Sequence, residues 1–459
     1  MTPTLLALFA YLVLQFGIGI WVSRRIRSES DYLIAGRRLG YPLAVFSIFA
    51  TWFGAESIVG SAGNAYRDGV SLANAEPFGY GLCLILMGLV FAAPLWRRKL
   101  TTLADLFRQR FSVGVERFAA VVLIPSSLLW AAAQIRGFGH VLATASTLEV
   151  ESAITVAAAC VVLYTVFGGL LADAITDLVQ GLLLTAGLLA LFFGVASRAG
   201  GPGAMFAGLF AGGPPALGAG GAGFWALAEE WAIPVCGSVV ATELVSRVIA
   251  ARTPAVARNA ALYGGGLYLV VGLIPLMLGA AGARLLPGLA DAEQIVPALA
   301  QDHLPLVFFA LFAGALVSAI LSTVDSTLLV SSGLLSHNLL VPLLGITDEA
   351  TKVRLARGGV ALFGVVAYLL ALRAEGVYAL VEQASAFGSS GALVLVVFGL
   401  FTRMGGALAG FAALGGGLGV YLGGVALAWP YPYLASLATA LAGFLLAASW
   451  EARRPAGTG

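Results

Sequence analysis

Long runs of apolar residues alternate with short polar segments along almost the whole chain. About thirteen of these runs are long enough to cross about 30 Å of hydrocarbon as a helix. The runs are too long and too continuous for barrel strands, and backbone groups in lipid must be paired within the chain. The pattern therefore predicts an all-α polytopic membrane protein whose spans lie near residues 4–22, 42–65, 76–95, 119–146, 153–170, 178–197, 225–249, 261–282, 304–334, 358–372, 378–400, 406–427 and 433–449.

Two of the apolar runs are interrupted, at residues 53–57 (FGAES) and at residues 234–238 (PVCGS). Transporter binding sites lie near the midplane of the membrane, where helices break and expose backbone polar groups. The two interruptions are five spans apart, and an odd number of crossings inverts the second copy of a repeat. We therefore expect two inverted five-helix repeats in one transmembrane domain, made of a leading helix (1–24), a first repeat (42–197), a second repeat (225–401), two C-terminal helices (406–450) and a cytoplasmic tail (451–459).

The run around residue 320 carries an unusual density of polar side chains, among them Ser322, Thr323, Asp325 and Ser326. A carboxylate in hydrocarbon costs about 3 kcal/mol even on the gentler insertion scales, so Asp325 is expected to face a cavity or an ion path. Hydroxyl and carboxylate oxygens are hard ligands that suit an alkali cation better than a transition metal. The segment therefore predicts a sodium site.

Composition excludes a soluble globular class, because 60% of the residues are hydrophobic, 10% are charged and the mean hydropathy is +0.95. The net charge of +2 gives no basic surface for nucleic acid. Lys and Arg gather in alternate loops, which predicts an external N-terminus and a cytoplasmic C-terminus. Arg greatly outnumbers Lys, and Ala, Gly and Leu dominate, as is typical of a GC-rich genome. We therefore expect a multi-pass protein of the bacterial cytoplasmic (inner) membrane.

The inventory of reactive side chains excludes the common enzyme classes. His140, His303 and His337 are scattered over three regions, and they form no zinc motif or catalytic triad. The glycine run at residues 415–419 lacks the strand and the Lys of a phosphate loop. The sequence thus predicts a protein that is no enzyme, has no organic cofactor and requires no protein partner, with the lipid bilayer and a small solute as its partners.

Four segments together resemble the sodium:solute symporter family: SDYLIAGRRLG (30–40), ATWFGAESIVGSAGNAY (50–66), GGLLADAITDLVQ (168–180) and SAILSTVDS (318–326). The resemblance implies the LeuT-type fold, a five-plus-five inverted repeat with flanking helices. It also implies Na+ as the coupling ion. Its ligands would be the backbone carbonyls of Ala50, Phe53 and Ala319 with the hydroxyls of Ser322 and Thr323. Asp177 and Ser326 would correspond to a second sodium site or an ion path, to which we add Asp325.

Within this family, PFGYGLCLILMGLVFA (77–92) and LLWAAAQIRGFG (128–139) are most similar to high-affinity choline transporters. The likeness implies an aromatic cage of Trp52, Tyr80 and Trp130, in which a desolvated cation–ring contact contributes about 2 kcal/mol. Ala241 stands where a fourth aromatic residue is expected, which weakens the case for choline itself. Glu56 and Gln134 are expected to add polar contacts to the solute.

These observations favour Na+-coupled symport of a small cation, zwitterion or amino-acid-like solute by alternating access. A proton-coupled carrier that uses Asp325 or Asp177 remains an alternative, as does a solute sensor without net transport. We also expect Asp177 just beyond a span on the cytoplasmic side, where it would be a solvated loop charge or an N-cap of the sixth helix if it had no role in ion transport. Glu243 and Arg247, four residues apart, are expected to form an ion pair. Arg136 and His140 are expected to reach outward or to fill an interface.

Overall fold

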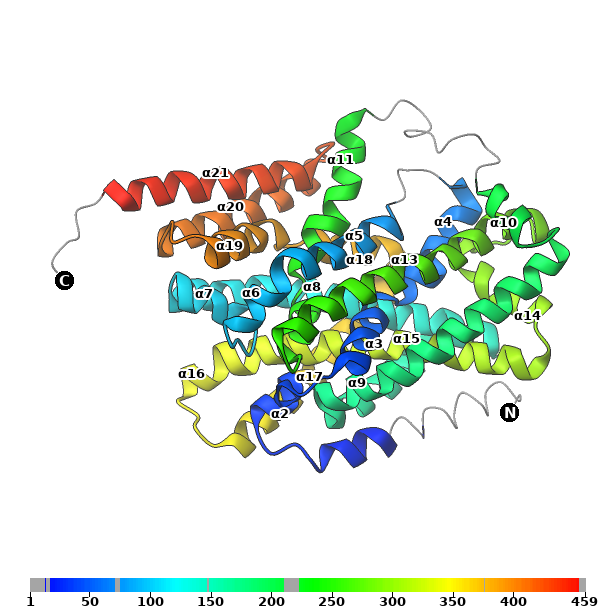
Figure 1. Cartoon of the computed structure of the whole chain (residues 1–459), viewed down its shortest axis with the longest axis horizontal. Helices are drawn as coiled ribbons and strands as arrows, with labels where there is room; N and C mark the ends of the chain where they lie inside the picture. Colours follow the sequence, from blue (N-terminus) through cyan, green and yellow to red (C-terminus); the bar gives the residue numbers. More distant parts are fainter. Residues whose placement is uncertain are drawn as a thin grey trace.

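A computed structural model of the chain describes residue 13 and residues 17–70, 75–146, 148–209, 223–374 and 376–453. Within these ranges the chain is helical throughout, and one isolated bridge joins Leu39 to Ala251. The longest helices run side by side, and α15 packs against both α8 and α9 (Figure 1). The α-helices are α2 (Glu29–Ile34), α3 (Tyr41–Trp52), α4 (Ser61–Asp68), α5 (Phe78–Leu86), α6 (Ala92–Arg97), α7 (Ala104–Arg110), α8 (Val113–Ala145), α9 (Val150–Arg198), α10 (Pro202–Gly208), α11 (Phe224–Ala232), α12 (Thr242–Ala250), α13 (Pro254–Leu285), α14 (Ile295–His303), α15 (Leu306–Gly333), α16 (Val341–Leu344), α17 (Glu349–Arg373), α18 (Val377–Ala386), α19 (Ser389–Phe401), α20 (Ala407–Ala426) and α21 (Pro432–Arg453).

Short 3-10 and π-helical segments connect several of these helices. They are η1 (Ala35–Arg37), η2 (Glu56–Gly60), η3 (Met87–Phe91), η4 (Ile233–Gly237), η5 (Ser238–Val240), η6 (Ala292–Gln294) and η7 (Leu334–Leu340). The first interruption predicted from the sequence coincides with a bend, and the second lies just before one. The axis turns by 56° between α3 and the η2–α4 segment, and by 42° between the α11–η5 segment and α12. The two broken spans are therefore confirmed.

The expected number of thirteen spans is not confirmed. By length and composition, the described residues contain eight spanning helices, or up to eleven when each bent pair is one span. Most of the first expected span, residues 4–22, lies outside the described residues. The expected spans 153–170 and 178–197 belong to the one element α9, which is kinked at Gly169.

The kink in α9 corrects the expected position of Asp177. Gly169 has φ +64°, and a Cβ there would lie 2.9 Å from the ring of Tyr32, so glycine is required. After Gly169 the chain continues as helix without a loop, and Asp177 is fully buried. The sequence suggested a loop because polar residues cluster there, whereas the structure turns them toward other helices.

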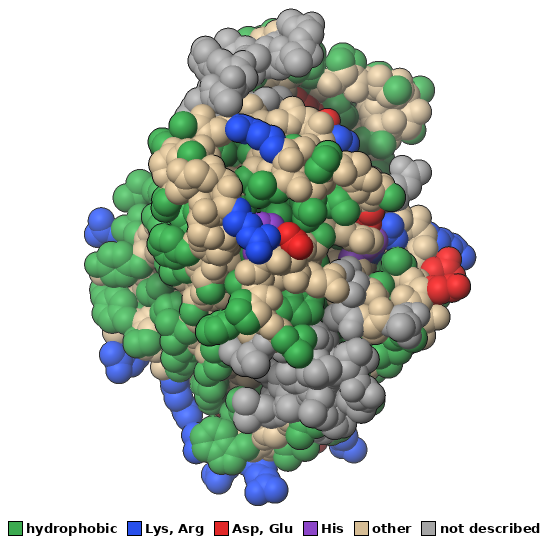
Figure 2. Space-filling view, turned by 90° about the vertical axis from the view of Figure 1, so that its right-hand side faces the viewer, with side chains coloured by type: hydrophobic (Ala, Val, Ile, Leu, Met, Phe, Trp, Pro, Cys, Tyr) green, Lys and Arg blue, Asp and Glu red, His purple; other side chains and the backbone are tan. Residues whose placement is uncertain are grey.

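A third bend was not predicted. It separates α18 from α19 by 42° at Gly388, which has φ +70° and approaches Val122 of α8 closely. Large apolar side chains cover much of the outer surface, as expected for a protein in contact with lipid. Figure 2 looks onto the end of the bundle formed by α4 and α14, where charged and histidine side chains lie in a hollow among apolar ones.

Candidate functional site

The break after α3 is held together by one glutamine. Phe53 leaves the helical conformation with ψ +63°, and a Cβ on Gly54 would lie 2.5 Å from Gln134 Oε1. Gln134 Oε1 accepts the backbone N–H of Ala55 at 2.7 Å, and Gln134 Nε2 donates to Glu56 Oε2 at 2.6 Å. Gln134 on α8 thereby satisfies both a backbone donor that the break exposes and the buried Glu56 carboxyl.

The expected sodium ligands lie on two segments that meet at this break. Thr323 Oγ1 on α15 is 3.3 Å from the carbonyl oxygen of Ala50, at the end of α3. Ser322 and Thr323 are buried, and Ala319 lies one turn earlier on α15. Phe53 is the residue at which α3 ends. Carbonyl and hydroxyl oxygens therefore gather where α15 passes the broken span.

Asp177 adds a carboxylate to this gathering of oxygens. The Ser322 hydroxyl donates to Asp177 Oδ1, and the Ser47 hydroxyl donates to Asp177 Oδ2 at 2.6 Å. Asp177 thus connects α9 with both α3 and α15. Its position next to the expected sodium ligands fits an ion path better than a solvated loop.

Asp325 and Ser326 face different surroundings from those of Asp177. Asp325 accepts a hydrogen bond from the Thr165 hydroxyl on α9, and both residues line a small cavity beside Gly169. Ser326 donates to Asp173 Oδ2 at 3.1 Å. Asp177 thus contacts Ser322, and one turn away along the same two helices Ser326 contacts Asp173.

Arg247 pairs with Asp173, and the expected pair of Glu243 with Arg247 is wrong. Arg247 on α12 donates to both Asp173 and Ser326, and it is fully buried. Glu243 instead accepts a hydrogen bond from the hydroxyl of Ser127 on α8. The spacing of Glu243 and Arg247 along one helix suggested that they pair, but Asp173 from α9 pairs with the Arg247 guanidinium instead.

Trp52 and Trp130 are buried beside the first break, and Tyr80 is buried against α18. The rings of Trp52 and Trp130 are 5.2 Å apart and inclined by 68°. Tyr80 Oη lies 3.2 Å from the Ser385 hydroxyl on α18. Ala241 occupies the second break, directly before α12, with an extended ψ of +132°. Two of the three expected cage residues are thus in ring contact, and the third lies against α18.

Sequence reasoning missed a buried carboxylate, Glu76. Its Oε1 accepts the hydroxyl of Tyr268 on α13, and the Tyr268 hydroxyl lies 2.6 Å from that of Ser57. Glu76 is only 3% exposed. It directly precedes Pro77 at the start of an apolar run, so the sequence alone gave no sign that the side chain turns inward.

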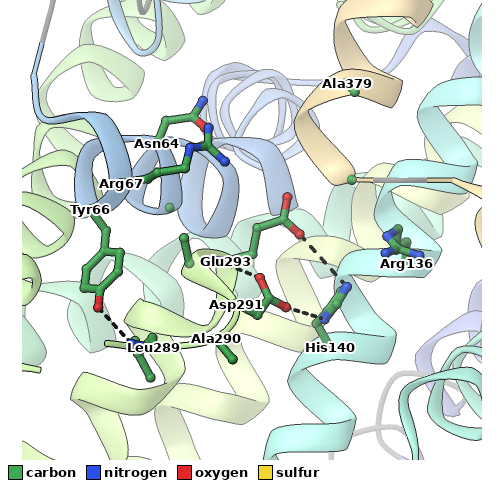
Figure 3. Close-up of a pocket in the computed structure, with 13 residues that line it drawn as sticks. Asn64, Tyr66, Arg67, Arg136, His140, Leu289, Ala290, Asp291, Glu293 and Ala379 are labelled. Carbon is green, nitrogen blue, oxygen red and sulfur yellow. Dashed lines mark hydrogen bonds and ion pairs between the residues drawn. The ribbon is translucent and has the colours of Figure 1, made fainter. Parts of the chain in front are cut away.

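A cavity of about 620 Å³ opens at the end of the bundle shown in Figure 2. Figure 3 shows His140 of α8 pointing toward Asp291 and Glu293, with contacts of 3.4 Å and 4.0 Å. Burial raises the pKa of Glu293, although the backbone N–H of Val377 donates to it. Arg136 also lines the cavity (Figure 3), so it and His140 face a water-accessible vestibule at the end of the bundle.

Comparisons with known proteins agree on one family. The model of the sodium:solute symporter family matches residues 32–415. A human high-affinity choline transporter is 27% identical over 421 residues, which cover 82% of this chain and 69% of that protein. A sodium/pantothenate symporter of Escherichia coli is 30% identical over 207 residues, 43% of this chain and 42% of that protein.

Solved structures show the same architecture. A Na+-coupled sialic acid symporter in a substrate-bound outward-open state superposes with a TM-score of 0.82 at 17% identity, and 97% of each chain is covered. Mhp1, a nucleobase-cation-symport-1 family transporter in a closed conformation, gives a TM-score of 0.63 at 17% identity, covering 93% of this chain and 95% of that chain. These matches establish the expected LeuT-type fold.

Proposed function

Because the chain belongs to the sodium:solute symporter family, a family of transporters and not of enzymes, we propose that it couples Na+ entry to uptake of a small organic solute. The carried ion would be held by the carbonyls of Ala50, Phe53 and Ala319 with the hydroxyls of Ser322 and Thr323. The solute would lie at the first break, in contact with Trp52, Tyr80, Trp130, Glu56 and Gln134, and beside Ala241. A small cation, zwitterion or amino-acid-like compound suits these side chains. We further propose that the chain resides in a bacterial cytoplasmic membrane with its N-terminus outside.

One observation carries the proposed sodium site: Thr323 on α15 lies 3.3 Å from the carbonyl of Ala50 on α3. Oxygen ligands from both helices can surround one alkali cation only while the helices stay together. Ion binding would therefore stabilise one arrangement of the broken span against α15. Such differential affinity is what allows an ion to shift a conformational equilibrium.

The mechanism follows from this coupling of the ion to one arrangement of helices. Na+ bound between α3 and α15 would favour a state that is open toward the cavity of Figure 3, and solute binding would then close that end. By linkage, Na+ and solute raise each other's affinity by the same factor, typically 1–3 kcal/mol of coupling. Asp177, which accepts a hydrogen bond from the Ser322 hydroxyl, would receive the ion as it leaves.

The test is the thermal unfolding of the purified protein in buffers that contain either Na+ or K+. A ligand at 100 times its dissociation constant stabilises the folded state by about 2.7 kcal/mol. We expect stabilisation by Na+ alone, and its loss in Ser322→Ala. Ser331→Ala is a matched control, because among the described residues this buried hydroxyl on α15 bonds to Thr327 of its own helix.

An equal response to Na+ and K+, or an unchanged Ser322→Ala variant, would remove the sodium assignment. Proton coupling through Asp177 or Asp325 would then be the better explanation. A solute sensor would bind Na+ and solute yet accumulate no labelled solute in proteoliposomes under a sodium gradient. Measured sodium-driven accumulation would exclude that alternative.

A further inference from the structure

Two buried carboxylates, Glu56 and Glu76, lie close in sequence to the aromatic residues of the expected cage. Glu56 follows Trp52 by four residues on the broken span, and Glu76 precedes Tyr80 by four residues. Gln134 likewise follows Trp130 by four residues on α8. Farther along the same two elements, Asn64 and Arg136 line the cavity of Figure 3, as do other residues of α4 and α8. Along the broken span and α8, the polar side chains of Glu56 and Gln134 therefore lie between the aromatic residues and the opening.

Hydroxyl groups connect Glu76 to the residue beside Glu56, and Glu56 itself accepts a hydrogen bond from Gln134 Nε2. Glu76 bonds to Tyr268, and Tyr268 bonds to Ser57, the neighbour of Glu56. Among the described residues, no Lys, Arg or His forms an ion pair with Glu56 or Glu76. Glu76 Oε2 is buried, and it has no hydrogen-bond partner among the described residues. Buried carboxylates without a counter-charge are unfavourable, and either a proton or a bound cation can neutralise them.

We propose, on the basis of the symport function argued above, that Glu56 and Glu76 bind the cationic group of the solute, and that this group carries N–H donors. The solute is then a primary or secondary ammonium, or a guanidinium. A quaternary ammonium has no N–H to offer to Glu76 Oε2 and instead needs aromatic faces on all sides. Ala241 supplies no such face at the second break.

The specificity follows from the same chemistry. A site built to receive N–H donors rejects an analogue that lacks them, because its buried acceptors are then left unpaired. The preference for a primary amine over its quaternary analogue should be at least about tenfold, the factor that one charge-assisted hydrogen bond supplies. Ethanolamine and choline form a matched pair of probes, because they differ only by three methyl groups on the nitrogen. Putrescine offers a second ammonium to the second carboxylate.

The experiment measures thermal unfolding of the full chain in Na+ buffer with ethanolamine, putrescine or choline. We expect both primary amines to stabilise the protein, with choline at least about tenfold weaker by titration midpoint. Glu56→Gln and Glu76→Gln should each lose the response to amines. Glu116→Gln is the control, because this buried glutamate bonds to Asn338 far from the break. Glu76→Asp keeps the charge and should retain part of the response, which covers the case in which Glu76→Gln does not fold.

The other outcomes distinguish failure of the carboxylate site from failure of Na+ coupling. Choline binding as tightly as ethanolamine, an unchanged amine response in both Glu76 variants, or no response to any of the three probes would overturn the proposed site. Amine stabilisation that is equal in Na+ and K+ and persists in Ser322→Ala would support the carboxylate site while overturning Na+ coupling. The two proposals can therefore fail separately.

Discussion

Gly54 lies against the two side chains that hold the first break. A Cβ there would lie 2.5 Å from Gln134 Oε1 and 2.8 Å from Glu56 Oε2, so Gly54→Ala must displace the hydrogen bonds that hold the break. We expect this variant to lower the free energy of unfolding by about 1–3 kcal/mol, a typical effect of overpacking. Chemical denaturation in detergent measures the change.

Gly266→Ala is the matched control for this substitution. Gly266 lies inside α13 and has nothing within 4 Å of its Cβ position, so alanine there should be neutral or stabilising by up to about 1 kcal/mol. Equal destabilisation by both substitutions would contradict the role assigned to Gly54.

Residue chemistry was predictable from the sequence where a side chain is unusual for its surroundings. Ser322 and Thr323 drew attention because polar groups are rare in such an apolar run, and the family motif then paired them with Ala50. Glu76 gave no comparable signal, because a glutamate before Pro77 is equally compatible with a solvated loop. Its inward orientation depends on Tyr268, a residue distant in sequence and supplied by the tertiary structure.

At the scale of elements, one buried ion pair fastens α12 to α9. Arg247 and Asp173 are both nearly inaccessible to solvent, and Ser326 of α15 joins them. Removing one partner of a buried pair leaves an uncompensated charge and destabilises by about 3–5 kcal/mol. We expect Asp173→Asn to destabilise by this amount in a denaturation experiment.

Asp302→Asn provides the comparison for the buried pair. Asp302 pairs with Arg198 at 3.6 Å, but both side chains are more than half exposed. Surface pairs contribute about 0–1 kcal/mol, so this change should be small. Comparable losses in the two variants would mean that the Arg247 pair does not fasten the helices.

Asp105 on α7 likewise joins two elements, because it pairs with His337 on η7. Burial alone would raise its pKa, but His337 and the backbone N–H groups of Thr101 and Thr102 outweigh burial and lower it. A carboxyl with a lowered folded pKa contributes stability above its unfolded pKa of about 3.9, and the contribution is lost as pH falls through the folded value. Asp105→Asn should therefore destabilise at pH 7, and its difference from the natural chain should shrink at low pH. A difference that grows as pH falls from 7 to 4 would contradict this assignment.

Breaks in the helices were likewise predictable only where unusual residues mark them in the sequence. The break at residues 53–57 and the break that follows residues 234–238 were predictable because Gly, Pro and polar residues interrupt apolar runs. The kink at Gly169 and the bend at Gly388 were not, because glycine is common throughout these spans. Their positive φ values accompany close approaches of Tyr32 and Val122, and such contacts exist only in the folded bundle.

At the scale of the whole molecule, the cavity of Figure 3 and a second pocket beside α12 share no lining residue. Ala379 lines the first and Thr101 lines the second. Alternating access requires that one side opens as the other closes. If Na+ fastens α3 to α15 and favours the state open toward the first cavity, then thiol modification of the two sites must respond in opposite directions.

We therefore expect Na+ to speed the modification of Ala379→Cys and to slow that of Thr101→Cys, relative to K+, in chains whose partly exposed Cys160 and Cys236 are replaced by serine. Both effects should vanish when Ser322→Ala is added, because the ion then loses one ligand that joins the two helices. Asp302→Cys, an exposed site on α14, controls for direct effects of Na+ on the thiol reaction. Rates that change in the same direction at both sites would indicate general tightening of the bundle, and they would argue against a sodium-driven exchange between two open states.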